Sequence, residues 1–172
     1  MSNLSFDVVC MYDDAIVENV EDGAMLAKFA VERDLSLLDL PADAKPTVFK
    51  CRSLSRDVRR KIRDLGDETQ NELAFRYGVV EVQNLRREDG TIESLTLPRH
   101  KPTDALSDEV LDSLGIPDVD ISEVGSVVRT RSFLGHARRL KYPVLASSQL
   151  ALEAAVYHRA VRRKDSETKA GS

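Results

Sequence analysis

The stretch from residue 45 to residue 98 limits the possible folds more than any other part of this sequence. A β-prone run from Thr47 to Cys51 comes first, and two helical patterns separated by Gly66 follow it. The dipeptide Asp89-Gly90 then lies between two further β-prone runs, which is the strongest short hairpin signal in the chain. Strands joined by a hairpin pair antiparallel, so the stretch predicts a small antiparallel sheet covered by helices.

The first helical pattern of this stretch is amphipathic. Ser55 is the expected N-cap, and Val58, Ile62 and Leu65 recur at the spacing of one helix face before Gly66 ends the helix. The other positions are basic: Arg56, Arg59, Arg60, Lys61 and Arg63. Nearby carboxylates are expected to neutralise much of this charge, so a solvated face is the preferred interpretation and contact with nucleic acid is the alternative.

The second helical pattern starts at Asp67. Gln70 stands three residues later, which indicates a capping box, and Gly78 is the expected residue just beyond the helix. The two strands of the hairpin are expected at residues 79–85 and 91–97.

Residues outside this stretch supply one more strand and several helices. Residues 4–11 are predicted to form a strand, and Asp13-Asp14 is interpreted as a turn. A helix follows Asp22-Gly23. Towards the C-terminus, helices are expected at residues 108–114, from Asp120 with Glu123 completing a capping box, and at residues 144–164.

These elements predict an α+β fold: a small antiparallel sheet with a β-hairpin, covered by helices, and a helical C-terminal region. We expect a single domain at residues 1–164, with an α+β part at residues 1–98 and a helical part at residues 103–164. A mobile tail is expected at residues 165–172. The length of 172 residues is usual for one domain, and 42% hydrophobic with 31% charged residues is typical of a soluble globular protein.

Two further features place the chain in the cytosol when it is made. No apolar run is long enough to span a bilayer, and the first residues lack the pattern of a signal peptide, so no membrane contact is expected. Cys10 and Cys51 both lie in strand-like runs, and we interpret them as reduced, buried thiols.

The charge of the chain is distributed unevenly. Residues 1–123 hold 15 Lys/Arg and 26 Asp/Glu, a balance of −11, whereas residues 124–164 hold nine Lys/Arg and one Glu, a balance of +8. Residues 165–172 add −1, which gives the net charge of −4. This asymmetry indicates an anionic partner, self-association through complementary surfaces, or an internal contact between the two regions.

The basic C-terminal quarter supplies the candidate partner-binding residues. These are Arg129, Arg131, Arg138, Arg139, Lys141, Arg159, Arg162, Arg163 and Lys164. The segment at residues 135–143 interleaves basic residues with Tyr142, which suits single strands or phosphates, although a basic loop between two helices explains the same pattern. The apolar side of the last helix is wide enough to bury in the domain or to dock on a partner.

No sequence pattern points to catalysis. Cys and His residues lack zinc spacing, and no phosphate-binding loop, dinucleotide fingerprint or nucleophile elbow is found. The spacing of His100, His136 and His158 does not favour a Cys–His nucleophile. We therefore expect no enzyme activity, no catalytic or metal-binding residue and no cofactor.

Four short segments carry a resemblance to a known family. They are TVFKCRSLS at residues 47–55, FRYG at residues 75–78, VVEVQNL at residues 79–85 and EDG at residues 88–90. Their order resembles a group of small tailed-bacteriophage morphogenesis proteins, usually labelled tail assembly chaperones or tail-assembly-like structural proteins. The resemblance covers about one-third of the chain, and its motifs are structural. The basic C-terminal region departs from the group.

The resemblance implies a non-enzymatic role in virion assembly, exerted by protein–protein binding. The implied partners are phage tail, tape-measure or connector proteins in the host cytoplasm, and a place in the virion near the tail or neck is left open by the departure at the C-terminus. Self-association and DNA contact also stay open. The alternative function is a nucleic-acid-binding module that uses the basic C-terminal quarter and lies near DNA in the virion.

Overall fold

The computed structural model describes residues 5–134, and their fold is α+β, as predicted. Clustering of contacts divides the described residues into two compact units. The larger unit consists of residues 5–10 and 45–134, and the smaller unit of residues 11–44. The predicted single domain extends beyond the described residues and stays a prediction. The helix expected at residues 144–164 and the tail at residues 165–172 lie outside them.

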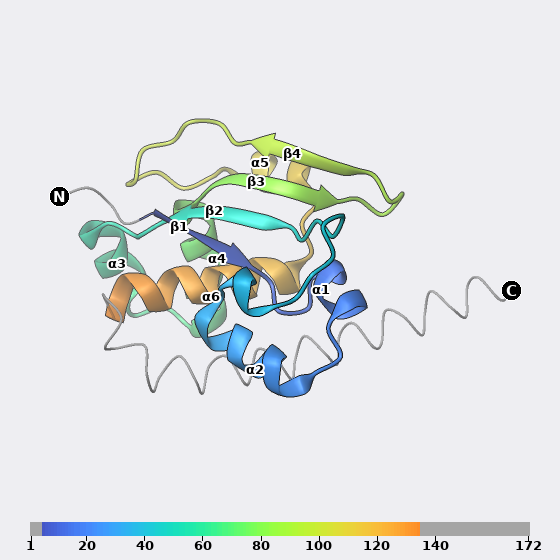
Figure 1. The fold of residues 1–172 in the computed structure, drawn as a ribbon. Coiled ribbons are helices and arrows are strands. Elements are labelled where there is room, and N and C mark those ends of the chain that lie inside the picture. Colours follow the sequence, from blue (N-terminus) through green and yellow to red (C-terminus); the bar gives the residue numbers. More distant parts are fainter. Residues whose placement is uncertain (1–4, 135–172) are drawn as a thin grey trace, which may run out of the picture. The chain divides into compact units, whose positions relative to one another are not determined.

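The larger unit contains an antiparallel sheet of four strands in the order β1-β2-β3-β4 (Figure 1). The strands are β1 (Ser5–Val9), β2 (Val48–Arg52), β3 (Val79–Arg86) and β4 (Ile92–Thr96). Phe6 pairs with Cys51, and Phe49 pairs with Val82. The register of β3 and β4 shifts after Val82, where Asn84 has a left-handed φ of 58°. The bulge adds local twist to this edge of the sheet.

The predicted hairpin between β3 and β4 is confirmed. The amide of Arg87 donates to the carbonyl of Thr91 at 2.8 Å, and Gly90 has a φ of +87°. The Asp89 carboxylate accepts hydrogen bonds from the backbone amide and the hydroxyl of Thr91, which lower the pKa of Asp89. The Asp-Gly signal of the sequence therefore marks the turn correctly.

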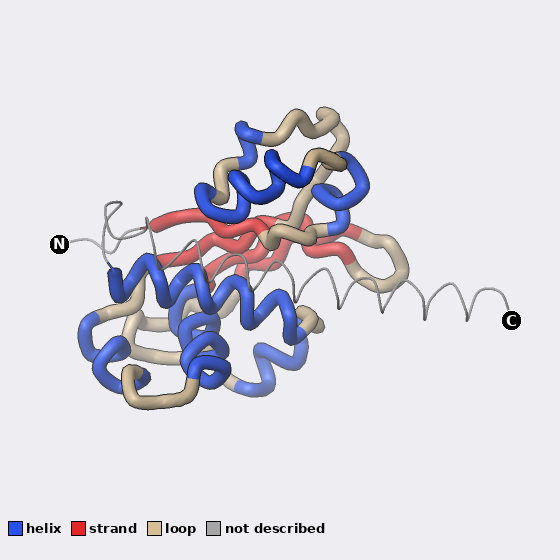
Figure 2. The backbone as a smooth tube through the Cα atoms, turned by 90° about the horizontal axis from the view of Figure 1, so that it is seen from below, coloured by secondary structure: helices blue, strands red, loops and turns tan. Residues whose placement is uncertain are grey.

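Four helices belong to the larger unit: α3 (Arg56–Ile62), α4 (Asp67–Gly78), α5 (Asp108–Leu114) and α6 (Asp118–Leu134). The longest of them, α6, lies along the sheet and packs against α4, β1 and β2 (Figure 2). A Cβ at Gly125 would stand 1.8 Å from the backbone oxygen of Asn71, so the α4–α6 crossing needs glycine at this position. The backbones of the two helices thus approach each other closely at this crossing.

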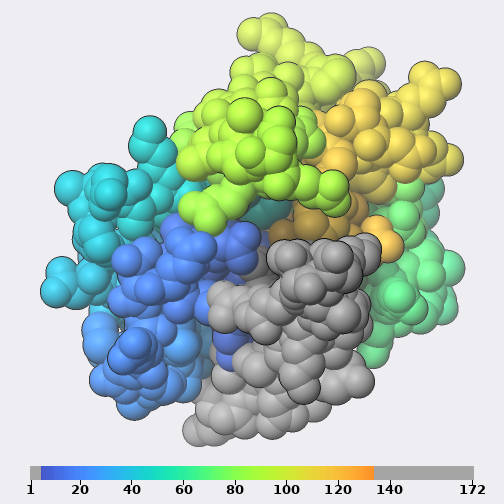
Figure 3. All heavy atoms as spheres, turned by 90° about the vertical axis from the view of Figure 1, so that its right-hand side faces the viewer, coloured from blue at the N-terminus to red at the C-terminus, as the bar shows by residue number. Residues whose placement is uncertain are grey.

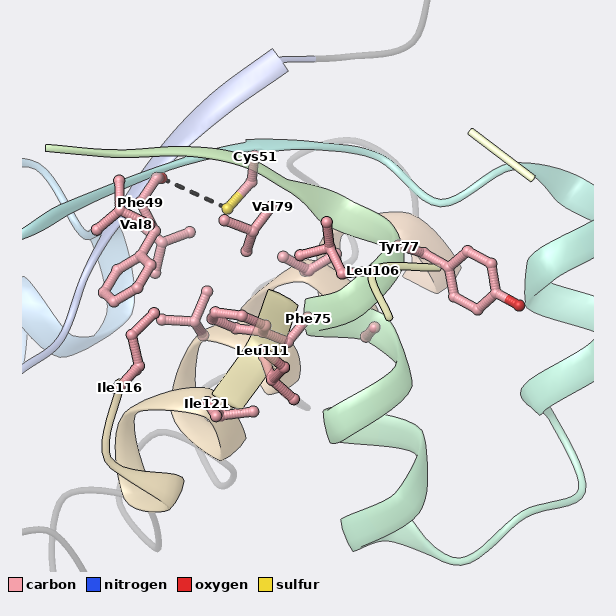
Figure 4. Packing of buried hydrophobic residues seen from close by; sticks show 14 of the residues in the cluster. Val8, Phe49, Cys51, Phe75, Tyr77, Val79, Leu106, Leu111, Ile116 and Ile121 are labelled. Atoms are coloured by element: carbon pink, nitrogen blue, oxygen red, sulfur yellow. Dashed lines mark hydrogen bonds between the residues drawn. The ribbon is translucent and has the colours of Figure 1, made fainter. Parts of the chain in front are cut away.

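Aromatic and aliphatic side chains fill the space between the sheet and its helices. The rings of Phe49 and Phe75 meet edge to face with centroids 5.8 Å apart, and Figure 4 shows them beneath the strands. Val8, Val82 and Val124 are fully buried in the same cluster. This single core joins all four strands to α3, α4, α5 and α6.

Several predicted helix boundaries were wrong. The capping box at Asp67 is absent, because α4 begins at Asp67 after Gly66, and the Gln70 amide instead donates to the carbonyls of Arg63 and Leu65. Gly78 is the last residue of α4 and does not follow it; its lack of a side chain leaves room for Val128.

The remaining differences concern α6 and the end of α3. Helix α6 begins at Asp118 and not at Asp120, because Pro117 already accepts the first hydrogen bonds of the helix. Leu65 is 41% exposed, since it follows the end of α3 and so leaves the buried stripe formed by Val58 and Ile62.

The smaller unit contains α1 (Asp14–Asn19), α2 (Gly23–Glu32) and the 3₁₀ helix η1 (Leu35–Leu37). The predicted turn at Asp13-Asp14 is the start of α1, because the Asp13 carboxylate accepts a hydrogen bond from the Ala15 amide as an N-cap. Asp22 caps α2 in the same manner, which confirms the helix expected there. Arg33 follows the last residue of α2 as its C-cap and has a left-handed φ of 55°.

Candidate binding groove

A groove lies in the larger unit between α4, α5 and the start of α6. It has a volume of about 480 Å³. Figure 3 shows the side of the molecule where α5 (yellow) and the first residues of α6 (orange) adjoin α4 (green). The groove is lined by Glu68, Thr69, Glu72, Arg76, Leu111, Asp112, Gly115, Ile116, Asp118, Ile121 and Ser122.

One face of α4 forms the polar wall of the groove. Glu68, Glu72 and Arg76 follow one another at intervals of four residues, so they share that face. Arg76 pairs with Glu72 at 3.1 Å and with Asp108 at 2.6 Å, and it donates to the carbonyl of Leu106 at 3.2 Å. These bonds hold the segment around the start of α5 against α4.

Arg76 keeps its positive charge beside these two carboxylates. Burial acts to lower its pKa, but the hydrogen bonds and charges of Glu72 and Asp108 together raise the pKa above the ordinary arginine value. The guanidinium therefore stays protonated, and its two carboxylate partners are already neutralised within the chain.

The floor of the groove is apolar and nearly buried. Leu111, Ile116 and Ile121 line it, and they are only 7–8% exposed because they also belong to the hydrophobic core. An occupant would therefore gain limited apolar contact at the floor, and most of its contacts would be with the polar rim.

Besides Glu72, which pairs with Arg76, the rim carries three exposed carboxylates, those of Glu68, Asp112 and Asp118. None of them forms an ion pair with another residue between positions 5 and 134. Carboxylates around an apolar floor suit a cationic side chain such as Lys or Arg. No group of three or more His, Cys, Asp or Glu side chains within the described residues is arranged to hold a metal ion.

Two of the predicted partner-binding arginines fall within the described residues. Arg129 donates to the backbone oxygen of Asp67 at 3.2 Å and lies 3.6 Å from its carboxylate. The guanidinium of Arg131 lies over the ring of Phe6 at 4.7 Å from its centroid, a cation–π contact. Both arginines thus contribute to packing within the larger unit, and their role towards a partner stays a prediction.

The other seven predicted residues lie outside the described part of the chain. They are Arg138, Arg139, Lys141, Arg159, Arg162, Arg163 and Lys164. The groove carboxylates, in contrast, were not predicted as a site. Only the four-residue spacing of Glu68, Glu72 and Arg76 could have indicated one shared face, and nothing in the sequence connects that face to Asp112 and Asp118.

The basic face of α3 is less neutralised than the sequence indicated. Arg59 is half-buried and donates to the carbonyl of Ser132 at 2.9 Å. The other four cations, Arg56, Arg60, Lys61 and Arg63, are exposed. No ion pair joins them to a carboxylate within residues 5–134, and Asp67, one of the neighbouring carboxylates, pairs with Arg129.

The cysteines are buried, free thiols, as expected. The Cys51 thiol donates to the carbonyl of Phe49 at 3.4 Å, and burial is the main cause that raises its pKa far above the ordinary value (Figure 4). A protonated, enclosed thiol is a poor nucleophile. His100 lies in the loop after β4, where its Nδ1 is 3.2 Å from the carbonyl of Pro98.

Comparison with known proteins gives no significant match to a family model, to a curated protein or to a solved structure. None of the helices between residues 5 and 134 has the length and apolar character that crossing a bilayer requires. The likeness to phage morphogenesis proteins therefore rests on the segments within residues 47–90 alone.

Proposed function

We propose that this chain is a non-enzymatic bacteriophage morphogenesis protein that acts by binding other proteins. The observation that supports the binding role is the groove, because a floor of buried core residues and a rim of exposed carboxylates suit a basic side chain. The role in virion assembly comes from the resemblance of residues 47–90. The partners we propose are tail, tape-measure or connector proteins, met in the host cytoplasm during assembly.

The groove favours a particular kind of partner surface. An occupant that inserts Lys or Arg between α4 and α5 would contact Glu68 and Asp112 on the rim. Since the floor is nearly covered, electrostatic complementarity would contribute more to specificity and association rate than to affinity. The proposed binding is accordingly weak for a single contact and suited to repeated contacts in an assembly.

Mass spectrometry of purified virions and of unassembled intermediates tests this function, with particles of the phage whose genome encodes the chain. We expect peptides of the chain in at least one of the two samples. Peptides in intermediates alone would indicate the chaperone-like role, and stoichiometric copies in particles would indicate a structural component. Absence from both samples would refute the proposal.

Nucleic-acid binding by the basic C-terminal quarter is the second candidate function. The balance of +8 over residues 124–164 favours it. If phosphate contacts provide the binding, affinity for DNA or RNA falls steeply with salt, and Ala at Arg138, Arg139, Arg162 and Arg163 flattens that dependence. Equal binding by wild type and variant at every salt concentration would rule this candidate out.

A further inference from the structure

Two exposed surfaces of opposite charge lie on the larger unit. The first is the groove rim of Glu68, Asp112 and Asp118, which we call the acidic rim. The second is formed by Arg56, Arg60 and Lys61 on the exposed side of α3 and by Arg63 just after it, and we call it the basic patch. The exposed carboxylates of Asp57 and Asp64 lie in the same segment but form no ion pair with these cations. Both surfaces are built on helices that the same hydrophobic core holds in place.

The two surfaces do not neutralise one another within the chain. No ion pair between residues 5 and 134 joins a cation of the basic patch to a carboxylate of the acidic rim. Within residues 5–134, each surface therefore keeps its charge available for binding.

The stability of the helices does not account for both surfaces. Acidic residues at the start of a helix and basic residues at its end interact favourably with the helix dipole, which explains Glu68, Asp118, Arg60 and Lys61. Asp112 is in the last turn of α5 and Arg56 is the first residue of α3, where the dipole disfavours each charge. These two residues need another explanation.

We propose that the acidic rim binds the basic patch of a second copy of this chain. Charge complementarity is the reason for choosing this occupant, since cations at fixed positions on a folded helix lose little conformational freedom when they bind. The inference rests on the proposed protein-binding role of the groove and identifies the partner as the chain itself.

The proposed contact has a defined symmetry. Because two different surfaces meet, the association is head-to-tail, and repetition of the contact gives a closed ring or an open filament. Exposed ion pairs are individually weak and are screened within about 8 Å at physiological ionic strength. Self-association of the purified chain is therefore expected at low salt and is expected to weaken as salt is added.

Charge reversal of each surface tests the contact in the full-length chain. The rim variant carries Glu68→Lys, Asp112→Lys and Asp118→Lys, and the patch variant carries Arg56→Glu, Arg60→Glu and Lys61→Glu. The matched control carries Asp39→Lys, Asp43→Lys and Glu88→Lys, three exposed carboxylates that do not line the groove. We expect the rim and patch variants each to weaken self-association about tenfold or more in sedimentation velocity, and the control to resemble wild type.

Mixing the two variants is the decisive measurement. Each variant repels its own copies, but in a 1:1 mixture every rim faces a patch of opposite charge, so association is expected to return. Circular dichroism verifies that the variants are folded. If a reversed rim disturbs α4 or α6, the neutral variant Glu68→Gln, Asp112→Asn, Asp118→Asn provides the same test with less strain on the helix dipole.

Three results would overturn the inference: a monomeric wild-type chain at low salt, a rim variant that associates as strongly as the control, or no association in the mixture. A further variant reverses the charge of Arg159, Arg162 and Arg163. If this variant loses self-association and the patch variant does not, the acidic rim binds the C-terminal segment of the second copy and not its α3, which also overturns the inference. A monomeric chain that is found in virions would refute only this inference. A self-associating chain that is absent from virions and intermediates would refute only the proposed function.

Discussion

At the scale of single residues, Ser132 makes the most consequential polar contact of α6. Its hydroxyl donates to the carbonyl of Val128 at 2.7 Å and accepts a hydrogen bond from the Leu54 amide at 2.8 Å, and the residue is 5% exposed. The contact ties the chain just before α3 to the last turns of α6, although the two residues are 78 positions apart.

We predict that Ser132→Ala destabilises the fold by about 1–2 kcal/mol. The substitution leaves the buried Leu54 amide without an acceptor, and the better helix propensity of Ala offsets only part of that loss. Urea unfolding measures the change in the free energy of unfolding. Ser126→Ala in the same helix is the control, expected within about 0.5 kcal/mol of wild type, and equal effects of the two substitutions would contradict the prediction.

Cys51 makes stability depend on alkaline pH. Burial raises the pKa of this thiol in the folded state, whereas a cysteine thiol in the unfolded chain has a pKa of about 8.5. Below about pH 8.5 the Cys51 thiol is protonated in both states, and its contribution to the free energy of unfolding is fully present. As the pH rises from there towards the folded-state pKa, only the unfolded chain releases the proton, so the folded state loses stability relative to the unfolded state.

Replacement of this thiol by Val removes the dependence. We expect the difference in unfolding free energy between wild type and Cys51→Val to change by about 1 kcal/mol between about pH 7.5 and about pH 9.5, in favour of the variant at the higher pH. Urea unfolding under reducing conditions at both pH values gives the comparison. An identical difference at the two pH values would show that the thiol does not titrate differently in the two states.

At the scale of helices and strands, the crossing of α4 and α6 depends on the absence of a side chain at Gly125. A Cβ there would collide with the backbone of Asn71, which cannot rotate away, whereas a Cβ at Gly78 would meet the Val128 side chain at 2.7 Å. The first collision forces two helices apart, and the second displaces one methyl group.

We predict that Gly125→Ala costs about 3 kcal/mol or more of stability, and that Gly78→Ala costs less. Gly23→Ala serves as the control, because no atom lies within 4 Å of the added Cβ and the residue opens α2. Chemical unfolding of the three variants gives the ranking. If the Gly125→Ala protein were as stable as the Gly23→Ala protein, the crossing of α4 and α6 would have room for a Cβ at residue 125, which would contradict the prediction.

At the scale of the whole molecule, we expect the protection of backbone amides against hydrogen exchange to decrease from the centre of the sheet to its β4 edge. Strands β2 and β3 pair on both sides and bury two and three residues, respectively. Strand β4 pairs only with β3 and has one partly buried residue among four exposed ones. Strands that open locally need to break fewer contacts when they lie at an edge.

Hydrogen exchange followed by mass spectrometry tests this gradient. We expect peptides that cover residues 92–96 to exchange faster than peptides that cover residues 48–52, after correction for intrinsic rates. Equal protection of the two strands would indicate that something covers the β4 edge in solution, and a dependence of that protection on protein concentration would identify a second copy as the cover.

The sequence by itself determined the local features of this protein. Asp89-Gly90 and Ser55 marked the hairpin and one helix start correctly, because turns and caps are decided by the backbone chemistry of a few adjacent residues. The α+β class followed, since strand and helix periodicities are also local properties of the chain.

Only the tertiary structure decided which charges are free and which residues form a site. Gln70 was expected to complete a capping box at the start of α4, but its amide donates to the carbonyls of Arg63 and Leu65 after α3. Asp67, a carboxylate close to the cations of α3 in the sequence, pairs with Arg129. The acidic rim combines carboxylates from α4, α5 and α6. The exposed cations of α3 form no ion pair with another residue within residues 5–134. Such arrangements depend on packing between segments distant in the chain, and local sequence patterns carry no information about which segments meet.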